Sequence, residues 1–263
     1  MSFVGRKKKD IMKIKIELLS SNKNIKVKTG YNALIQALIY NNISDKLSRK
    51  LHDEGFLYEK RKFKLFTFSS ILERGSFDKI KKEFKFPQSI SFYISSPVDY
   101  ILEDMARTFI NASGVRLGNN KLFVSSVNVI NTMLPDSNIL KINAVTPIEM
   151  HSTLKKADGK NFTHYYSPFE EEFSILIRDN LLKKWSVYYK EKIESSFTIK
   201  PLFKNKNNEK IVYFGTREKR TLVKGWKGYF NIESDNPKLL KFALNTGLGG
   251  RNSQGFGMIE VVK

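Results

Sequence analysis

Hydrophobic and polar residues alternate along some stretches of this chain, and in other stretches they recur every three to four residues. The alternation at residues 12–18 predicts a β-strand, because successive side chains of a strand point to opposite faces of a sheet. At residues 31–43, apolar side chains such as Leu34 and Leu38 recur at the i, i+4 spacing of an amphipathic helix. A strand followed by a helix is therefore predicted for the first part of the pattern.

A second, short helix is predicted directly after the first one. Ser44 is a candidate N-cap, since its hydroxyl can accept a bond from a free backbone N–H of the first turn. Leu47 and Leu51 would lie on its buried side, and Gly55 is a candidate for the residue that ends it.

The rest of the N-terminal pattern completes a familiar supersecondary unit. The element order is β-α-β-β-α-β, the split βαβ or ferredoxin-like (RRM-like) arrangement, in which two helices cover one face of a sheet. The further strands are expected at residues 63–71, 89–95 and 121–131, and the second helix at residues 98–112.

A similar order of elements recurs in the second half, although the two halves share negligible sequence identity. We therefore predict an α+β protein with two tandem ferredoxin-like domains, at residues 12–134 and 135–263, which meet at a turn-rich stretch. Residues 1–11, which contain Lys7, Lys8 and Lys9, are expected to form a disordered basic leader. The elements of the second unit are expected as strands at 139–145, 197–203, 211–214, 221–232 and 258–262, with helices at 169–185 and 237–245.

Length and composition narrow the class of protein. A chain of 263 residues is long enough for two cores, and 41% hydrophobic residues without a membrane-length apolar run fit a soluble protein with no membrane partner. The absence of cysteine excludes disulfides and thiolate metal sites, and no secretory signal is apparent, so a cytoplasmic location is expected.

The charge of the chain favours a polyanionic partner. Lys and Arg number 46 against 26 Asp and Glu, a formal net charge of +20. A generally lysine-rich proteome would give the same net charge, so the distribution of the charged residues along the chain has to be considered as well. The densest stretch, residues 200–227, has nine cations and two acids among aromatic residues, which is typical of RNA-binding surfaces. The alternative is a solvated sheet edge with core aromatics. The cations assigned to RNA are Lys204, Lys206, Arg217, Lys219, Arg220 and Lys224.

A glycine-rich segment precedes the last predicted strand. Five of the 15 glycines of the chain lie within residues 245–257. Glycine allows positive φ and a close approach of backbone N–H groups to an anion, although such a loop could also serve only to position the last strand. The residues that we expect to contact RNA here are Gly247, Gly249, Gly250, Arg251, Asn252, Ser253, Gln254 and Gly255.

Few residues are suited to acid–base or metal chemistry. The chain has three histidines, His52, His151 and His164, and no spacing of His, Asp and Glu suggests a metal site. Metal-free RNA cleavage can use the ribose 2′-OH as nucleophile, with protein groups that move protons and stabilise the phosphorane. His52, at the end of the short helix and followed by two acids, suits a general acid, although a histidine in this position is more often a surface or capping residue.

Four segments together resemble a known family. Residues 37–43 (ALIYNNI), 50–56 (KLHDEGF), 63–69 (FKLFTFS) and 247–257 (GLGGRNSQGFG) are similar, in order and spacing, to the CRISPR repeat-processing endoribonucleases of the RAMP superfamily. The resemblance covers residues 12–263, although the middle third matches only in element order.

The resemblance implies both a fold and an activity. The fold would be two ferredoxin-like domains, and the activity metal-independent cleavage of precursor CRISPR RNA within each repeat, leaving 5′-hydroxyl and 2′,3′-cyclic phosphate ends. It places the catalytic tyrosine, histidine and lysine at Tyr40, His52 and Lys64, with no metal or cofactor, and leaves open whether Tyr40 or His52 activates the 2′-OH. CRISPR repeat RNA would be the partner, with an effector complex and a second copy of the chain as further candidates. The alternative is a non-catalytic RNA-binding subunit of such a complex.

Overall fold

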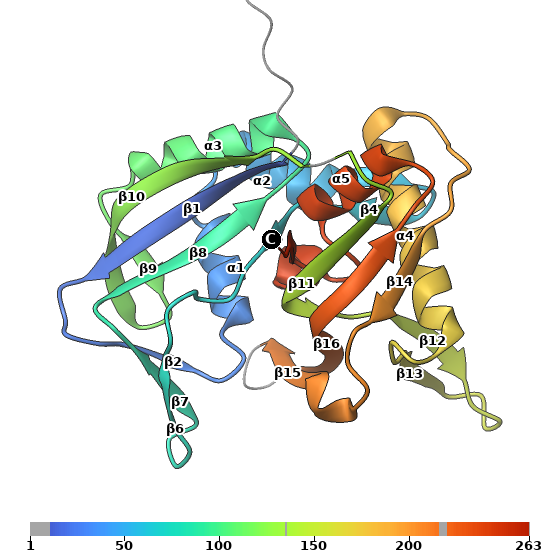
Figure 1. Ribbon diagram of the computed structural model, residues 1–263. Helices are drawn as coiled ribbons and strands as arrows, with labels where there is room; N and C mark the ends of the chain where they lie inside the picture. Colours follow the sequence, from blue (N-terminus) through green and yellow to red (C-terminus); the bar gives the residue numbers. More distant parts are fainter. Residues whose placement is uncertain (1–10, 135, 216–219, 263) are drawn as a thin grey trace, which may run out of the picture.

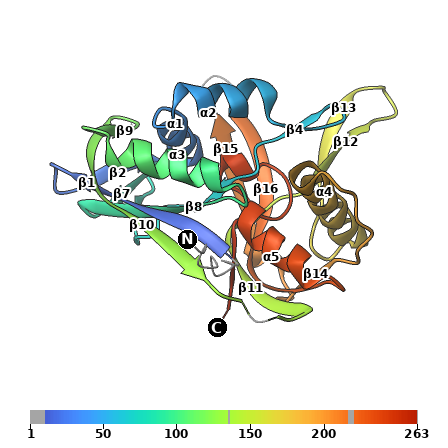
Figure 2. The same ribbon diagram turned by 90° about the horizontal axis from the view of Figure 1, so that it is seen from above.

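The computed structural model describes residues 11–134, 136–215 and 220–262. The chain forms two ferredoxin-like halves that lie side by side, each with an antiparallel sheet covered by two helices (Figure 1). Seen from above, α1 and α3 lie on the same side of the N-terminal sheet (Figure 2).

The N-terminal sheet has the strand order β5-β8-β1-β10-β9, with antiparallel pairing throughout. Without the added edge strand β9, the chain order is β-α-β-β-α-β and the first and third strands are central, which is the ferredoxin-like arrangement. The elements are β1 (Ile11–Ser20), α1 (Asn32–Tyr40), β5 (Thr67–Phe68), β8 (Ser89–Ser95), α3 (Asp99–Ile110), β9 (Val115–Leu117) and β10 (Asn120–Thr132).

The C-terminal sheet repeats this topology in the order β14-β16-β11-β17, and β15 forms a hairpin with the far end of β16. The sequence patterns predict the strands of this sheet and its two α-helices with ends that differ by a few residues, but not the two 3₁₀ turns. The elements are β11 (Ile139–Ile148), α4 (Glu171–Tyr189), β14 (Thr198–Pro201), the 3₁₀ turn η2 (Lys206–Asn208), β15 (Glu209–Gly215), β16 (Arg220–Glu233), α5 (Pro237–Thr246), the 3₁₀ turn η3 (Asn252–Gln254) and β17 (Ile259–Val261).

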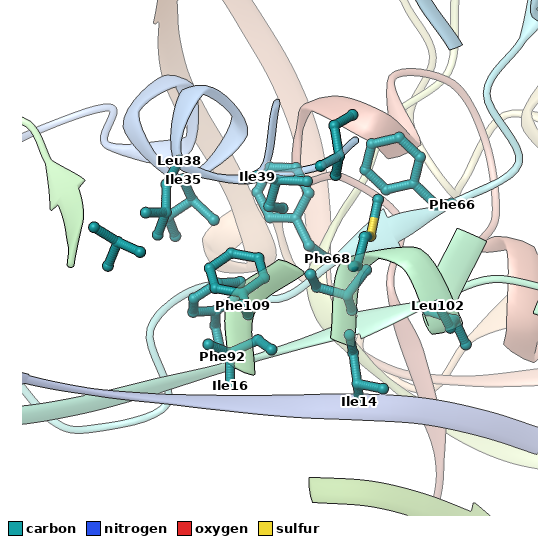
Figure 3. Close-up of a cluster of buried hydrophobic side chains, with 14 of the residues drawn as sticks. Ile14, Ile16, Ile35, Leu38, Ile39, Phe66, Phe68, Phe92, Leu102 and Phe109 are labelled. Atoms are coloured by element: carbon teal, nitrogen blue, oxygen red, sulfur yellow. The ribbon is translucent and has the colours of Figure 1, made fainter. Parts of the chain in front are cut away.

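Each half has its own hydrophobic core between its helices and its sheet. Figure 3 shows the first core, where Ile35 and Leu38 of α1 face Ile14 and Ile16 of β1. In the second core the helix α4 contributes Phe173, Ile177 and Leu181, which recur at i, i+4 spacing.

The short helix that carries His52 forms as the sequence predicts. The Ser44 hydroxyl accepts a bond from the backbone N–H of Leu47, and α2 (Asp45–Arg49) continues into a π-helical turn, η1 (Lys50–Glu54). Gly55 ends it with φ 61°, a conformation that favours glycine. Because Leu47 and Leu51 are buried in the first core, the turn that bears His52 is anchored to the domain.

Two expectations for the N-terminal half need correction. Ile11, assigned to the leader, is the first residue of β1 and is buried, while residues 1–10 with their lysine run lie outside the described residues. The single strand expected at 63–71 is two strands, β4 (Arg61–Phe63) and β5, because Leu65 between them has φ 52° and interrupts the extended backbone.

Several strands were not predicted from the sequence. They are the edge strand β9, β2 (Ile25–Lys28), β6 (Ser76–Asp78) and β7 (Glu83–Phe86) of a small sheet, β3 (Phe56–Tyr58), which pairs with β4, and the hairpin β12 (His151–Lys155) and β13 (Asn161–Tyr165). No helix of the described part of the chain is long and apolar enough to cross a membrane.

Candidate active site and glycine-rich loop

The glycine-rich loop joins α5 to β17 and bridges the two halves. Gln36 Nε2 of α1 donates to the Ser253 carbonyl at 2.8 Å, and Asn32 Nδ2 donates to the Gly255 carbonyl at 3.0 Å. The Thr67 hydroxyl of β5 donates to the Phe256 carbonyl at 3.2 Å. A loop of the C-terminal half is therefore fixed by polar contacts against the helix and strand of the N-terminal half that lie next to the predicted catalytic segments.

The glycines of this loop are required by contacts within the protein. A Cβ on Gly249 would lie 2.2 Å from the Glu149 carbonyl oxygen, and a Cβ on Gly250 would lie 2.4 Å from Glu149 Oε1. Gly247, Gly249, Gly250 and Gly255 are buried, whereas residues 251–254 are half-buried. The glycines therefore set the shape of the loop, and its outward part is the stretch from Arg251 to Gln254. RNA contact by any of these residues stays a prediction.

A buried lysine holds the loop from inside. Lys184 of α4 is 3% exposed and donates to the carbonyls of Gly247 and Gly249, both at 3.0 Å, and to Asn252 Oδ1 at 2.7 Å. Burial lowers the pKa of Lys184 well below its ordinary value. Three acceptors surround the three donors of one ammonium group, so this side chain fixes three points of the loop at once.

Glu149 holds the other side of the loop. Its carboxylate is fully buried and lies 2.8 Å from His151 Nδ1 and 3.7 Å from Arg251 Nε, while its backbone carbonyl accepts from the Gly250 N–H. Lys184 and Glu149 thus pack the loop from two directions, and Glu149 leaves no room for a Cβ at Gly249 or Gly250.

A pocket of about 210 Å³ opens between this loop and the segment from β4 to β5. Five cations line it, and among the described residues no Asp or Glu does. Such a lining favours an anionic ligand. The cations are Arg61, Lys62, Lys64, Lys184 and Arg251, and the other lining residues are Phe63, Leu65, Phe66, Asn180, Thr246, Gly249, Gly250, Asn252, Ser253 and Gln254.

His52 is accessible and is held by a neighbouring carboxylate. Its side chain is 80% exposed, and its Nδ1 lies 2.8 Å from Asp53 Oδ1. The hydrogen bond from His52 also lowers the pKa of Asp53. Because Nδ1 is engaged, Nε2 is the nitrogen that a substrate could reach.

Lys64 connects His52 to the pocket. Its Nζ donates to the His52 carbonyl oxygen at 3.2 Å, and its side chain lines the pocket beside the glycine-rich loop. Burial, and next the adjacent Lys62, lowers the pKa of Lys64, while Asp53 acts in the opposite direction. The structure thus brings together two of the three residues predicted as catalytic.

Tyr40 is the third predicted catalytic residue and lies at the end of α1. It is half-buried, with its ring 6.2 Å from that of Phe66, which lines the pocket. Burial raises the pKa of Tyr40 to about 12. The hydroxyl is therefore protonated near neutral pH, and the residue is suited to donating or accepting a hydrogen bond.

The basic stretch at residues 200–227 is exposed in only part of its length. Lys204 and Lys206 are exposed, whereas Lys224 is half-buried and lies 3.6 Å from Glu209 Oε1. Arg217 and Lys219 fall outside the described residues, as does the side chain of Arg220. Of the aromatic residues, Trp226 belongs to the second core and Tyr213 is 51% exposed.

Several residues of the site were not singled out from the sequence, among them Arg61, Lys62, Thr246 and the three that follow. Asn180 and Lys184 lie at i+3 and i+7 from Ile177, inside the apolar stripe of α4, and polar residues in such a stripe are a signal for a buried polar site. Glu149 follows an apolar strand directly and gives no comparable signal.

Two family models match the chain. One is described as "CRISPR-associated protein Cas6, N-terminal" and matches residues 26–128, and the other as "CRISPR associated protein Cas6, C-terminal" and matches residues 131–261.

Curated relatives and solved structures agree with these models. CRISPR-associated endoribonuclease Cas6 1 of Methanocaldococcus jannaschii is 27% identical, over 97% of this chain and 94% of its own length. CRISPR-associated endoribonuclease Cas6 of Pyrococcus furiosus is 27% identical, over 95% and 90%. Among solved structures, a Cas6-related protein from Pyrococcus furiosus has a TM-score of 0.80 at 19% identity, over 96% of this chain and 99% of its own. A structure described as "CRISPR associated protein Cas6" has a TM-score of 0.74 at 24% identity, over 96% and 100%. The chain belongs to the Cas6 family of CRISPR-associated proteins.

Proposed function

We propose that this protein is an endoribonuclease that binds CRISPR repeat RNA and cleaves precursor CRISPR RNA within each repeat. Relatives named as endoribonucleases match nearly the whole chain. The observation that carries the proposal is the arrangement of an exposed imidazole, His52, next to Lys64, which lines a cationic pocket.

The proposed reaction is an internal transesterification. The ribose 2′-oxygen attacks the adjacent phosphorus, and the bond from phosphorus to the 5′-oxygen breaks, which leaves a 2′,3′-cyclic phosphate and a 5′-hydroxyl. His52, as imidazolium, gives its proton to the departing 5′-oxygen, and Asp53 holds the ring for this step. Lys64 offsets the negative charge that develops on the phosphorane.

Tyr40 has a supporting role in this scheme. Because burial raises its pKa to about 12, it does not act as a phenolate base near neutral pH. Its hydroxyl orients the 2′-OH by hydrogen bonding, and water takes the 2′-proton.

RNA binding is assigned to both halves. Arg251 to Gln254 present the outward part of the glycine-rich loop at the pocket, and Lys204 and Lys206 extend a positive surface along the C-terminal half. The proposal divides the chain into two domains, residues 12–134 for catalysis and residues 135–263 as the centre of RNA binding. It also includes a cytoplasmic location, a homodimer and assembly with an effector complex.

The test is single-turnover cleavage of labelled repeat RNA by the full chain in the presence of EDTA. His52→Ala should slow cleavage by about 10²- to 10⁴-fold and leave RNA affinity nearly unchanged. His164→Ala is the matched control, because His164 pairs with Glu170 instead. A 2′-deoxy nucleotide at the cut site should block cleavage. Binding of the RNA without any product would favour the non-catalytic subunit, and a strict need for a divalent cation would refute the scheme.

A further inference from the structure

Among the described residues, two uncharged side chains that line the pocket have buried polar atoms without a hydrogen bond. Asn180 is 4% exposed and Thr246 is 1% exposed, and both line the pocket. Within the described part of the chain, Asn180 Oδ1, Asn180 Nδ2 and Thr246 Oγ1 accept and donate no hydrogen bond. Buried polar atoms are nearly always paired, so this group calls for a ligand or for ordered water.

The neighbouring lysine cannot fill this role. Lys184 lies one helical turn after Asn180 on the same face of α4, but its ammonium already donates to Gly247, Gly249 and Asn252. Arg251 Nε also lacks a hydrogen bond, but it lies 3.7 Å from Glu149 Oε1, which balances its charge. The uncharged groups of the lining that remain without a partner, within the described part of the chain, are the Asn180 carboxamide and the Thr246 hydroxyl.

The type of unfilled atom restricts the ligand. The Asn180 carboxamide offers a donor and an acceptor side by side. Either orientation of the amide group gives the same pair, because both its oxygen and its nitrogen lack a partner among the described residues. Phosphate oxygens only accept hydrogen bonds, so a phosphate would leave the acceptor unsatisfied. The edge of a nucleobase presents a donor next to an acceptor and satisfies both atoms.

The rest of the lining fits the same ligand. Arg61, Lys62 and Arg251 provide cations that can hold the phosphates on either side of an inserted base, and Phe63 and Phe66 pack beneath the lining. Lys64 lines the pocket and also bonds to the carbonyl of His52, so a base in this pocket belongs to a nucleotide close to the cut.

We propose that this pocket takes one unpaired base of the RNA, next to the scissile phosphate, and that Asn180 reads the edge of that base. The proposal rests on the proposed function, because it takes its ligand from the RNA of that reaction. It adds a specificity-determining residue on α4, in the half opposite to the predicted catalytic residues.

The first experiment changes only the RNA. The wild-type protein is given repeat RNAs from the host's own CRISPR array in which each nucleotide near the cut is replaced, one at a time, by an abasic residue or by each of the other three bases. One position should show a loss of about 10- to 100-fold in single-turnover rate or in affinity. Tolerance of an abasic residue at every position near the cut would overturn the proposal and indicate a pocket filled by water.

The second experiment changes the protein. Asn180→Leu keeps the approximate size of the side chain and removes both hydrogen-bonding atoms, and Ile175→Ala, an exposed position on the same helix, is the control. Asn180→Leu should abolish discrimination at that one position and keep it elsewhere, while the control discriminates as the parent does. Discrimination by Asn180→Leu that equals the parent at every position would overturn the proposal.

Affinity measurements separate this proposal from the proposed function. In the background of His52→Ala, the same RNAs are compared by equilibrium binding. If the parent binds the repeat without cutting it, the proposed activity is refuted. A base preference at one position that is lost in Asn180→Leu would still support the base pocket in that case. If cleavage proceeds as proposed but no such preference exists, only the base pocket fails.

Discussion

Gly249→Ala tests the claim that the glycine-rich loop is shaped by contacts within the protein. Gly249 has φ +71°, a conformation that L-residues seldom adopt, and a Cβ there would lie 2.2 Å from the Glu149 carbonyl oxygen. Since real Cβ atoms essentially never approach another heavy atom within 3.0 Å, the backbone of the loop or of Glu149 would have to move.

The expected cost has two parts. Placing alanine at positive φ costs about 1 kcal/mol, and forcing an extra methyl group into a packed site costs about 1–3 kcal/mol. We therefore expect the free energy of unfolding to fall by about 2–4 kcal/mol, which corresponds to a Tm lower by roughly 4–16 °C for a domain of this size.

Gly159→Ala is the matched control. Gly159 has φ +79°, close to that of Gly249, but a Cβ there meets nothing within 4 Å, so only the cost of the backbone conformation of about 1 kcal/mol applies. Urea unfolding of both variants and of the parent, followed by circular dichroism, measures the difference. Equal destabilisation by the two substitutions would refute the argument that Glu149 excludes a side chain at position 249.

Three further predictions concern the lysines and the tyrosine of the site. Burial lowers the pKa of Lys184, so the unfolded chain binds more protons than the folded one, and the parent's free energy of unfolding rises with pH up to the ordinary lysine pKa near 10.5. Lys184→Met should weaken this pH dependence, which urea unfolding from pH 7 to pH 10 measures. Lys64→Ala should slow single-turnover cleavage by about 10²-fold, whereas Lys60→Ala, exposed and outside the pocket lining, should not; equal rates would remove Lys64 from the mechanism. Tyr40→Phe should slow cleavage about tenfold at every pH from 6 to 9, because one hydrogen bond is lost; a parent rate that rises with pH in step with a phenolate would contradict this role.

Local patterns were sufficient to predict the elements that carry most of the site. Ser44 and Gly55 delimit the helical segment of His52 because capping depends on the hydroxyl and on the backbone of those two residues alone. The two ferredoxin-like units follow from strand alternation and helical periodicity, which report on the side of an element that is buried.

The contacts that assemble the pocket depend on residues far apart in sequence. Lys184 and Gly247 are 63 residues apart, and Gln36 and Ser253 are 217 residues apart, so no local pattern indicates either bond. The glycine content of the loop predicts either a close approach of RNA or a role in positioning the last strand, and it does not reveal that the nearest neighbour of Gly249 is Glu149, a residue 100 positions away in the sequence. The short strands were missed for a related reason, because strands of three to five residues depend on their pairing partners more than on their own residues.

The connection between the second helix and the last strand makes different contacts in the two halves. In the N-terminal half it contains β9, which pairs with β10 and adds Val115 and Leu117 to the core of its own half. In the C-terminal half it is the glycine-rich loop, which must fit α4 on one side and α1 on the other. Over evolutionary time a change in the first connection has to suit one half alone, whereas a change in the second has to be accommodated by both halves together, so the C-terminal connection should be the slower of the two to diverge.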